Sequence, residues 1–301
     1  MKEAIRQLFD WNIELLDMTD KAVLYFREQK YDKALEFMPS ISDKMRGVID
    51  TLIEDKDYFE LVSVESLMEM LEGILDAGRS MDYVLLADLL ELQLATLLCN
   101  VQALIMEKEE DAVYSEELYR RQCAKMAEVA KRDTPEAAEV ESLLLEPICP
   151  QKLLEDGYRI EYTSCGLMTV AVGVGNKTAV YLHSNHKISL ESFLLARAWA
   201  EPDRVDTYLI YGFDLGYHVA ELRKLVPGAR IEVYEPNGEM LKLACAFAPL
   251  ESLLAAEGLH LIYDPDGTAW TERVQRATER EKICIHVPAI RKNQKGTENK
   301  A

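Results

Sequence analysis

A glycine-bearing turn follows a short apolar stretch in the second half of the chain. The apolar stretch is TYLIY (residues 207–211), and the turn is GFDLG (residues 212–216). Glu235 lies 19 residues beyond Gly216, at the end of a second apolar stretch. In dinucleotide-binding folds such a turn opens a helix whose N-terminus binds an anion, and a carboxylate about 20 residues further on holds ribose hydroxyls. The spacing therefore predicts a site for a nucleoside-type ligand.

The predicted ligand site draws on strand ends and on one helix N-terminus. Asp264 ends a third apolar stretch and is expected to face the same crevice as Glu235. The predicted cofactor-binding residues are Gly212, Asp214, Gly216, Tyr217, His218, Glu235 and Asp264. Because Asp214 replaces the middle glycine of G-x-G-x-G, its carboxylate would repel a phosphate within ~4 Å. A nucleotide sugar, S-adenosylmethionine or a dinucleotide all remain candidates, and S-adenosylmethionine is penalised least.

Two polar residues, His183 and Ser184, follow another predicted strand. A serine–histidine nucleophile would need a third orienting group and an oxyanion hole, which the sequence does not reveal. His183 and His186 lie three residues apart, and a zinc site would need a third ligand, which His218 or Asp264 could supply only if the fold brought them together. We therefore predict no metal, and expect His183 and Ser184 to line the cleft as substrate-binding groups. Two further histidines are expected to be structural: His260 and His286.

The elements that must position these groups alternate between strand and helix. Strands are predicted over 207–211, 231–234 and 259–263, with helices over 217–226 and 238–247. Right-handed crossovers make such a β-α-β-α-β run a parallel sheet. Three short strands within 158–182 precede this run, and a last strand is predicted over 282–287. The second half is therefore predicted to be a β-hairpin lead-in followed by a Rossmann-like parallel-sheet domain.

The first half has the periodicity of packed helices. Phe9, Leu16 and Val23 recur every seven residues, which predicts a buried helical stripe. Ser40 and Ser63 are expected to cap the second and third helices, and a central apolar helix is predicted from about residue 81 to 107. We predict an antiparallel helical bundle over 1–146, the α/β domain over 151–290 and a polar tail over 291–301.

Composition restricts the possible partners. The net charge is −19, and residues 1–150 hold 16 basic against 33 acidic side chains, which argues against nucleic acid. The longest uncharged apolar run has 15 residues (92–106), shorter than the ~20 of a membrane span. Six dispersed cysteines favour reduced thiols and a cytoplasmic location. The acidic bundle is either a solvated face or a docking surface for a protein partner, and a homo-oligomer is also considered.

Three segments resemble the N-terminal region of the motility accessory factor family, bacterial proteins linked to flagellin glycosylation. They are YLHSNHKISLES, LIYGFDLGYHVAEL and IEVYEPNGEML. Members tend to read Leu-His-Ser, Asp-Pro, Glu-Ala, a Gly-Leu-Gly-Leu-Gly-Tyr-His turn and a strand ending in Glu-Pro. The matching positions are Leu182 to Ser184, Glu191, Gly212, Leu215 to His218, Glu235 and Pro236; Lys187, Ile188, Ser192 and Asp214 depart from the pattern. The similarity covers roughly residues 158–287.

The resemblance implies an accessory module of a glycosylation system. In that family the sugar-transferring unit resembles a second Rossmann-type domain with a Gly-Pro-Ser-Leu turn, which this sequence lacks. We therefore expect a non-catalytic or accessory module that binds a nucleoside-containing ligand, either as a fragment or as a shortened relative, and whether it is an enzyme stays open. The alternatives are an S-adenosylmethionine-dependent class I methyltransferase and a ligand-free scaffold.

Overall fold

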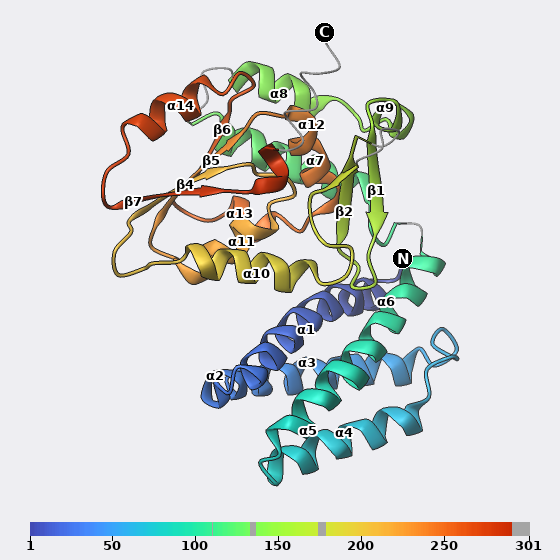
Figure 1. Ribbon diagram of the computed structural model, residues 1–301. Helices are drawn as coiled ribbons and strands as arrows, with labels where there is room; N and C mark the ends of the chain where they lie inside the picture. Colours follow the sequence, from blue (N-terminus) through green and yellow to red (C-terminus); the bar gives the residue numbers. More distant parts are fainter. Residues whose placement is uncertain (110, 133–136, 174–178, 291–301) are drawn as a thin grey trace. The chain divides into compact units, whose positions relative to one another are not determined.

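The computed structural model describes residues 1–109, 111–132, 137–173 and 179–290. The chain forms two compact units: residues 1–113 with 163–167, and residues 114–162 with 168–301 (Figure 1). The predicted polar tail, 291–301, lies outside the described residues.

The first unit is helical. Its elements are α1 (Glu3–Arg27), α2 (Tyr31–Leu35), α3 (Met38–Glu54), α4 (Val64–Arg79), α5 (Tyr83–Asp88), the π-helical η1 (Leu89–Leu94) and α6 (Ala95–Lys108). Helix α1 packs against α3, α5 and α6. Phe9, Leu16 and Val23 are all buried on α1, which confirms the stripe predicted from their seven-residue spacing.

Of the two predicted helix N-caps, Ser63 is confirmed and Ser40 is not. Ser63 caps α4 as expected, because its Oγ accepts from the backbone N–H of Ser66 at 3.2 Å. The prediction for Ser40 was wrong: α3 begins two residues earlier, at Met38. Pro39 then occupies the first turn, where its missing N–H leaves no helical hydrogen bond unmade.

A continuous helical stretch, Tyr83–Lys108, is long and apolar enough to cross a membrane, with a mean hydropathy of 1.7. Leu90, Leu94 and Leu98 of this stretch are buried in the core of the bundle. Length and composition are weak evidence here, because the core helix of a bundle satisfies the same criteria.

The second unit contains a four-stranded parallel sheet. Its strands are β4 (Thr207–Tyr211), β5 (Arg230–Glu235), β6 (Leu259–Tyr263) and β7 (Glu281–Ile285), in the order β6-β5-β4-β7. Tyr208, Leu209 and Ile210 on β4 are all fully buried, as expected for the centre of a sheet covered on both faces. This result confirms the predicted α plus α/β fold class at the level of a helix-rich chain with a parallel sheet.

Helices surround this sheet. They are α7 (Glu116–Ala130), α8 (Ala137–Leu145), α9 (Pro150–Glu155), α10 (Ile188–Trp199), α11 (Tyr217–Leu225), α12 (Gly238–Phe247), α13 (Glu251–Leu254) and α14 (Thr268–Gln275). Helix α11 packs against α10 and α13, and α12 packs against α7, α8 and β5. A small antiparallel sheet, β1 (Tyr158–Tyr162), β2 (Met168–Val172) and β3 (Val180–Tyr181), agrees with the predicted lead-in.

The boundary between the units lies earlier than predicted. The second unit begins at Tyr114 and not after residue 150, so α7 and α8 belong with the parallel sheet. The buried side chain of Gln122 on α7 donates to the carbonyls of Cys245 and Ala248 and accepts from the amide of Leu250 at 2.7 Å. Helical periodicity predicts that α7 has a buried face, but it cannot predict which unit covers that face.

Candidate functional site

The order of the parallel sheet reverses between β4 and β7. The chain builds β4, β5 and β6 in one direction, and β7 then pairs with the free side of β4. In open α/β sheets, ligands bind outside the carboxyl ends of the strands at such a reversal. The loop that follows β4 and the residue that follows β7, His286, both lie at this point.

Three histidines meet at the reversal. His183 follows β3, His218 lies in the first turn of α11, and His286 follows β7. All three are buried, with exposed fractions of 2%, 0% and 3%. One ring nitrogen from each lies within 4.8 Å of the other two. Their rings are also in contact, with centroids 4.4 Å apart for His218 and His286 and 5.1 Å apart for His183 and His286.

The loop after β4 orients two of these rings. Nε2 of His218 lies 3.0 Å from the carbonyl oxygen of Gly212, and Nδ1 of His286 lies 2.5 Å from Oδ2 of Asp214. Gly212 has φ +94°, and a Cβ there would stand 2.4 Å from the Cβ of Ala289. Only glycine therefore fits this position. The sequence placed Gly212 and Asp214 in a cofactor site, and the structure places both beside the histidines.

Burial keeps two of the rings neutral. Burial, with a smaller contribution from nearby His286, lowers the pKa of His183 to about 3. Burial also lowers the pKa of His218 well below its usual value, again with a contribution from the neighbouring histidines. Nε2 of His183 and Nδ1 of His218 have no hydrogen-bond partner among the described residues. Each is a buried polar atom without a partner, which is an uncommon and costly arrangement.

The position of Glu235 differs from the prediction. Its Oε2 accepts from the amides of Phe213 and Asp214 at 2.9 and 3.0 Å, and its Oε1 accepts from the amide of Asn237 at 2.9 Å. Glu235 is fully buried. The carboxylate of Glu235 therefore binds the loop after β4, whereas the sequence predicted that it would bind a ribose. Its partners in that loop are the amides of Phe213 and Asp214.

The carboxylate of Asp264 also accepts backbone amides. Its Oδ1 accepts from the amide of Ala269 at 3.1 Å and its Oδ2 from the amide of Trp270 at 2.8 Å. These are N–H groups of the first turn of α14, which have no partner within the helix. Asp264 is thus a buried helix cap, a role that the sequence did not predict.

Apolar side chains pack against Gly216, the residue that precedes α11. Gly216 has the expected positive φ, +78°, but a Cβ there would lie 2.8 Å from the ring of Phe213 and 3.0 Å from Leu250. Both of these side chains are buried. The hydroxyl of Tyr217 bonds the backbone amide and carbonyl of Met168 on β2, so it too has a structural partner. The side of Gly216 on which a Cβ would stand is therefore closed by apolar side chains.

The two predicted substrate-binding residues, His183 and Ser184, lie in different environments. His183 joins the histidine cluster, and its backbone is held by the hydroxyl of Thr169 at 2.8 Å. Ser184 is exposed, and its amide donates to Glu191 at 2.7 Å in the turn that precedes α10. Sequence analysis missed His286 because its role depends on β7 pairing with β4. The position of His286 at the end of a predicted strand was the one available signal.

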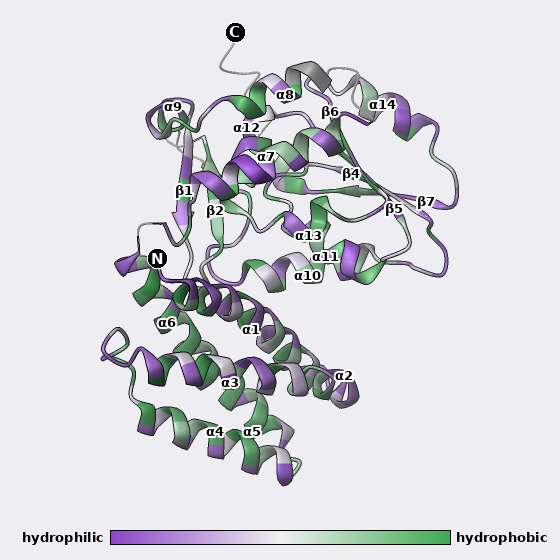
Figure 2. Ribbon diagram, turned by 180° about the vertical axis from the view of Figure 1, so that it is seen from behind, coloured by the Kyte–Doolittle hydropathy of each residue, from purple (hydrophilic) through white to green (hydrophobic). Residues whose placement is uncertain are grey.

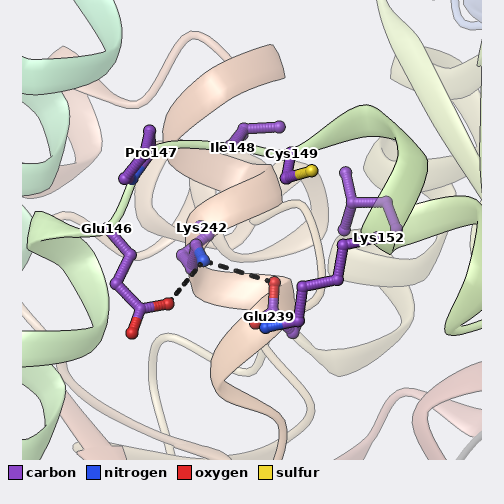
Figure 3. Close-up of a pocket in the computed structure, with 8 residues that line it drawn as sticks. Glu146, Pro147, Ile148, Cys149, Lys152, Glu239 and Lys242 are labelled. Atoms are coloured by element: carbon purple, nitrogen blue, oxygen red, sulfur yellow. Dashed lines mark hydrogen bonds and ion pairs between the residues drawn. The ribbon is translucent and has the colours of Figure 1, made fainter.

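A separate hollow of about 240 Å³ lies near α9 and α12 (Figure 3). Lys242 is almost fully buried there and forms ion pairs with Glu146 at 3.4 Å and with Glu239 at 3.6 Å. Because acidic side chains already compensate this charge, the hollow does not select an anion. No residue of the predicted ligand site lines it.

The geometry of the second unit thus separates the predicted site into two parts. The β4–β7 side holds His183, Gly212, Asp214 and His218, together with His286. The β5–β6 side holds Glu235 and Asp264 as structural caps. Comparison of the chain with protein-family models, with curated proteins and with solved structures found no match.

Proposed function

We propose that the second unit is a Rossmann-like, non-catalytic or accessory binding module of a motility accessory factor-type glycosylation system. The observation that carries this proposal is the reversal of strand order between β4 and β7, with buried polar groups gathered at it. The order β6-β5-β4-β7 corresponds to the order 3-2-1-4 found in dinucleotide-binding sheets. The resemblance of residues 158–287 to the family supplies the glycosylation context.

A nucleoside-containing ligand, such as a nucleotide sugar, would use contacts other than those predicted. Glu235 and Asp264 already accept backbone amides, which leaves them few acceptor sites for a ribose. An aromatic surface at the same edge offers an alternative. Tyr211 ends β4, and its ring lies 5.3 Å from that of Trp270 in α14, with both side chains partly exposed. Aromatic faces stack on bases with about 1–3 kcal/mol per base.

The first unit would serve as a docking domain for a protein partner. Leu61, Met68 and Leu75 are spaced seven residues apart and are 81%, 48% and 57% exposed. Figure 2 shows hydrophobic segments along α4, where the last two of these residues lie. Acidic side chains flank them: Glu65, Glu69, Glu72 and Asp76. An apolar stripe with acidic borders fits an amphipathic helix that carries lysine or arginine beside its own apolar stripe.

A scaffold without a small-molecule ligand is the second candidate. The apolar cover over Gly216 and the capping roles of Glu235 and Asp264 favour it. The methyltransferase alternative has less support, because the described residues contain four parallel strands, fewer than the seven-stranded sheet usual for such enzymes.

Thermal unfolding with a ligand panel tests these alternatives. A ligand at about 100 times its dissociation constant stabilises the folded state by ~2.7 kcal/mol. We expect a nucleotide sugar to raise the unfolding temperature and S-adenosylmethionine to leave it unchanged. The variant Trp270→Leu should weaken this effect, whereas Tyr162→Ala, an exposed residue of β1, should not. If S-adenosylmethionine alone stabilises the protein, it is methyltransferase-like; if no ligand does, the scaffold proposal replaces ours.

A labelled peptide tests the docking proposal. We expect a basic amphipathic helix to bind with an affinity that falls with salt, and an acidic peptide with the same apolar stripe not to bind. Exchanging Met68 and Leu75 for glutamate should abolish binding of the basic peptide. If sedimentation shows instead that these changes convert a dimer into a monomer, the surface is a self-association interface.

A further inference from the structure

We propose that His183, His218 and His286 together bind one divalent transition-metal ion, with zinc as the expected ion. The site joins three segments that are distant in the chain: the end of β3, the start of α11 and the end of β7. This proposal goes beyond the binding-module proposal, because a metal at this place does not require a nucleoside ligand.

The separation of the ring nitrogens suits a metal. Because the three atoms lie within 4.8 Å of one another, a point exists within about 2.8 Å of all of them, and zinc needs about 2.0–2.1 Å to each imidazole nitrogen. Each nitrogen would therefore move by less than about 1 Å on binding. The stacked rings of His218 and His286 would turn slightly in the same step.

The hydrogen bonds around the cluster leave suitable lone pairs. When Nε2 of His218 donates to the carbonyl of Gly212, Nδ1 of His218 carries the lone pair, and this is the nitrogen without a partner. When Nδ1 of His286 donates to Asp214, Nε2 of His286 carries the lone pair. Metal-binding histidines commonly donate their other nitrogen to a carbonyl or carboxylate in this way, which fixes both tautomer and orientation.

The unpaired nitrogen of His183 is the observation that an apolar or stacking role does not explain. Nε2 of His183 and Nδ1 of His218 are both buried and both without a donor. Neutral imidazole nitrogens are good ligands for zinc, copper and nickel and poor ones for magnesium or calcium. The ligand class is therefore a borderline-soft divalent metal. A single buried water that donates to two of the nitrogens is the competing explanation.

Metal analysis of the full chain decides between these explanations. We expect protein produced in zinc-supplemented medium to carry about one zinc per chain, and we expect a strong chelator to lower its unfolding temperature. Added zinc should restore that temperature, and added magnesium should not. Cobalt should give the visible absorption of a tetrahedral site. Less than a tenth of an equivalent of zinc, with no effect of zinc on unfolding, would favour the water and overturn the proposal.

Variants assign the ligands. His183→Gln, His218→Gln and His286→Gln should each abolish stoichiometric zinc, whereas His260→Gln, on β6 outside the cluster, should retain it. Circular dichroism checks that each variant folds. If the variants do not fold, cobalt titration of the unchanged protein still tests the site. Retention of a full equivalent of zinc by all three folded variants would contradict the assignment.

Asp214 is a positioning residue in this proposal. Its φ is +48°, a conformation that asparagine also tolerates, so Asp214→Asn should leave the backbone in place. A change to such an outer partner typically weakens metal binding 10–100-fold. Because the amide oxygen of asparagine can still accept from Nδ1 of His286, the loss of affinity should lie at the lower end of this range. We expect that loss in competition with a chelator, with one equivalent of zinc still bound at saturation. An unchanged zinc affinity with a lowered unfolding temperature would show that Asp214 is only structural.

Discussion

At the carboxyl ends of the parallel strands, the buried polar groups of the β5–β6 pair differ from those of the β4–β7 pair in their hydrogen bonding. On the β5–β6 side, both oxygens of Glu235 and both oxygens of Asp264 accept backbone N–H groups. On the β4–β7 side, buried ring nitrogens of His183 and His218 lack any partner among the described residues. The carboxylates of the first side have partners within the protein, whereas the second side has buried ring nitrogens that a bound group could satisfy.

This difference shows where a ligand can stabilise the fold. A carboxylate that already accepts two or three amides gains less from a ribose hydroxyl, because most of its roughly four acceptor sites are already used. A buried lone pair without a donor gains a full interaction from a metal or a water. The β4–β7 side is therefore the better functional candidate, although the sequence pattern pointed to the β5–β6 side.

The largest expected effect comes from removing the acceptor on the β5–β6 side. Glu235→Ala leaves the amides of Phe213, Asp214 and Asn237 without their acceptor, and all three belong to turns at the sheet edge. We expect a loss of about 3–4 kcal/mol in the free energy of unfolding, since each unpaired buried donor costs about 1–3 kcal/mol. Urea denaturation measures this loss. A change below about 1 kcal/mol would show that water reaches these amides readily.

A second prediction concerns the loop after β4. It compares the loss of stability when each of three glycines is changed to alanine. Gly212→Ala adds a Cβ that would stand 2.4 Å from Ala289 at a φ of +94°, so we expect a loss of about 2–3 kcal/mol. Gly267→Ala has a φ of +74° but no atom within 4 Å, so strain alone should cost about 1 kcal/mol. Gly228→Ala has neither problem and should be neutral.

Thermal or urea unfolding of the three variants separates contact from strain. If Gly212→Ala costs no more than Gly267→Ala, the loop after β4 can yield, and it would not hold His218 and His286 firmly. Zinc binding by Gly212→Ala should then also remain unchanged.

The third prediction tests the helix cap on the β5–β6 side. Asp264→Ala removes the acceptor for the amides of Ala269 and Trp270 at the start of α14. Loss of a cap costs about 1–2 kcal/mol, and Asp264→Asn should retain part of the capping because its amide oxygen still accepts. Hydrogen exchange of α14 should accelerate locally. Equal exchange in both proteins would contradict a capping role.

The sequence predicted the elements between residues 207 and 263 well, and for a local reason. Apolar runs end there at glycine, proline and asparagine, so the expected strands and helices agree with the structure to within about two residues. The spacing from Gly216 also led to Glu235, whose carboxylate does contact the turn after β4. It could not show whether a ribose or the chain's own amides meet the carboxylate, because backbone amides leave no mark on side-chain spacing.

The part of the site that sequence analysis missed depends on long-range pairing. His286 becomes a neighbour of His218 only because β7 lies beside β4, about 70 residues earlier in the chain. The packing of α7 through Gln122 is hidden for the same reason. Periodicity predicts that a face is buried, but the partner of that face is a property of the whole fold.

The smallest expected effect on stability comes from a network of ion pairs that connects β5 with β7. Arg273 on α14 pairs with Glu232 on β5 and with Glu281 at the start of β7. Hydrogen bonding to Arg273 lowers the pKa of Glu281 to about 2, from an ordinary value of 4.5. A folded-state pKa below the unfolded one stabilises the protein above about pH 4.5, and this contribution disappears as the pH falls towards 2.

Comparison of Glu281→Gln with the unchanged protein isolates this contribution, because other titrating groups are common to both. We expect the variant to be less stable by about 1 kcal/mol at pH 7, since Arg273 is partly exposed and water screens the pair. The difference should shrink between pH 4.5 and 2, where the carboxylate gains its proton. A constant difference over that range would mean that Glu281 acts through packing and not through charge. The network of ion pairs would then not link β5 to β7 electrostatically.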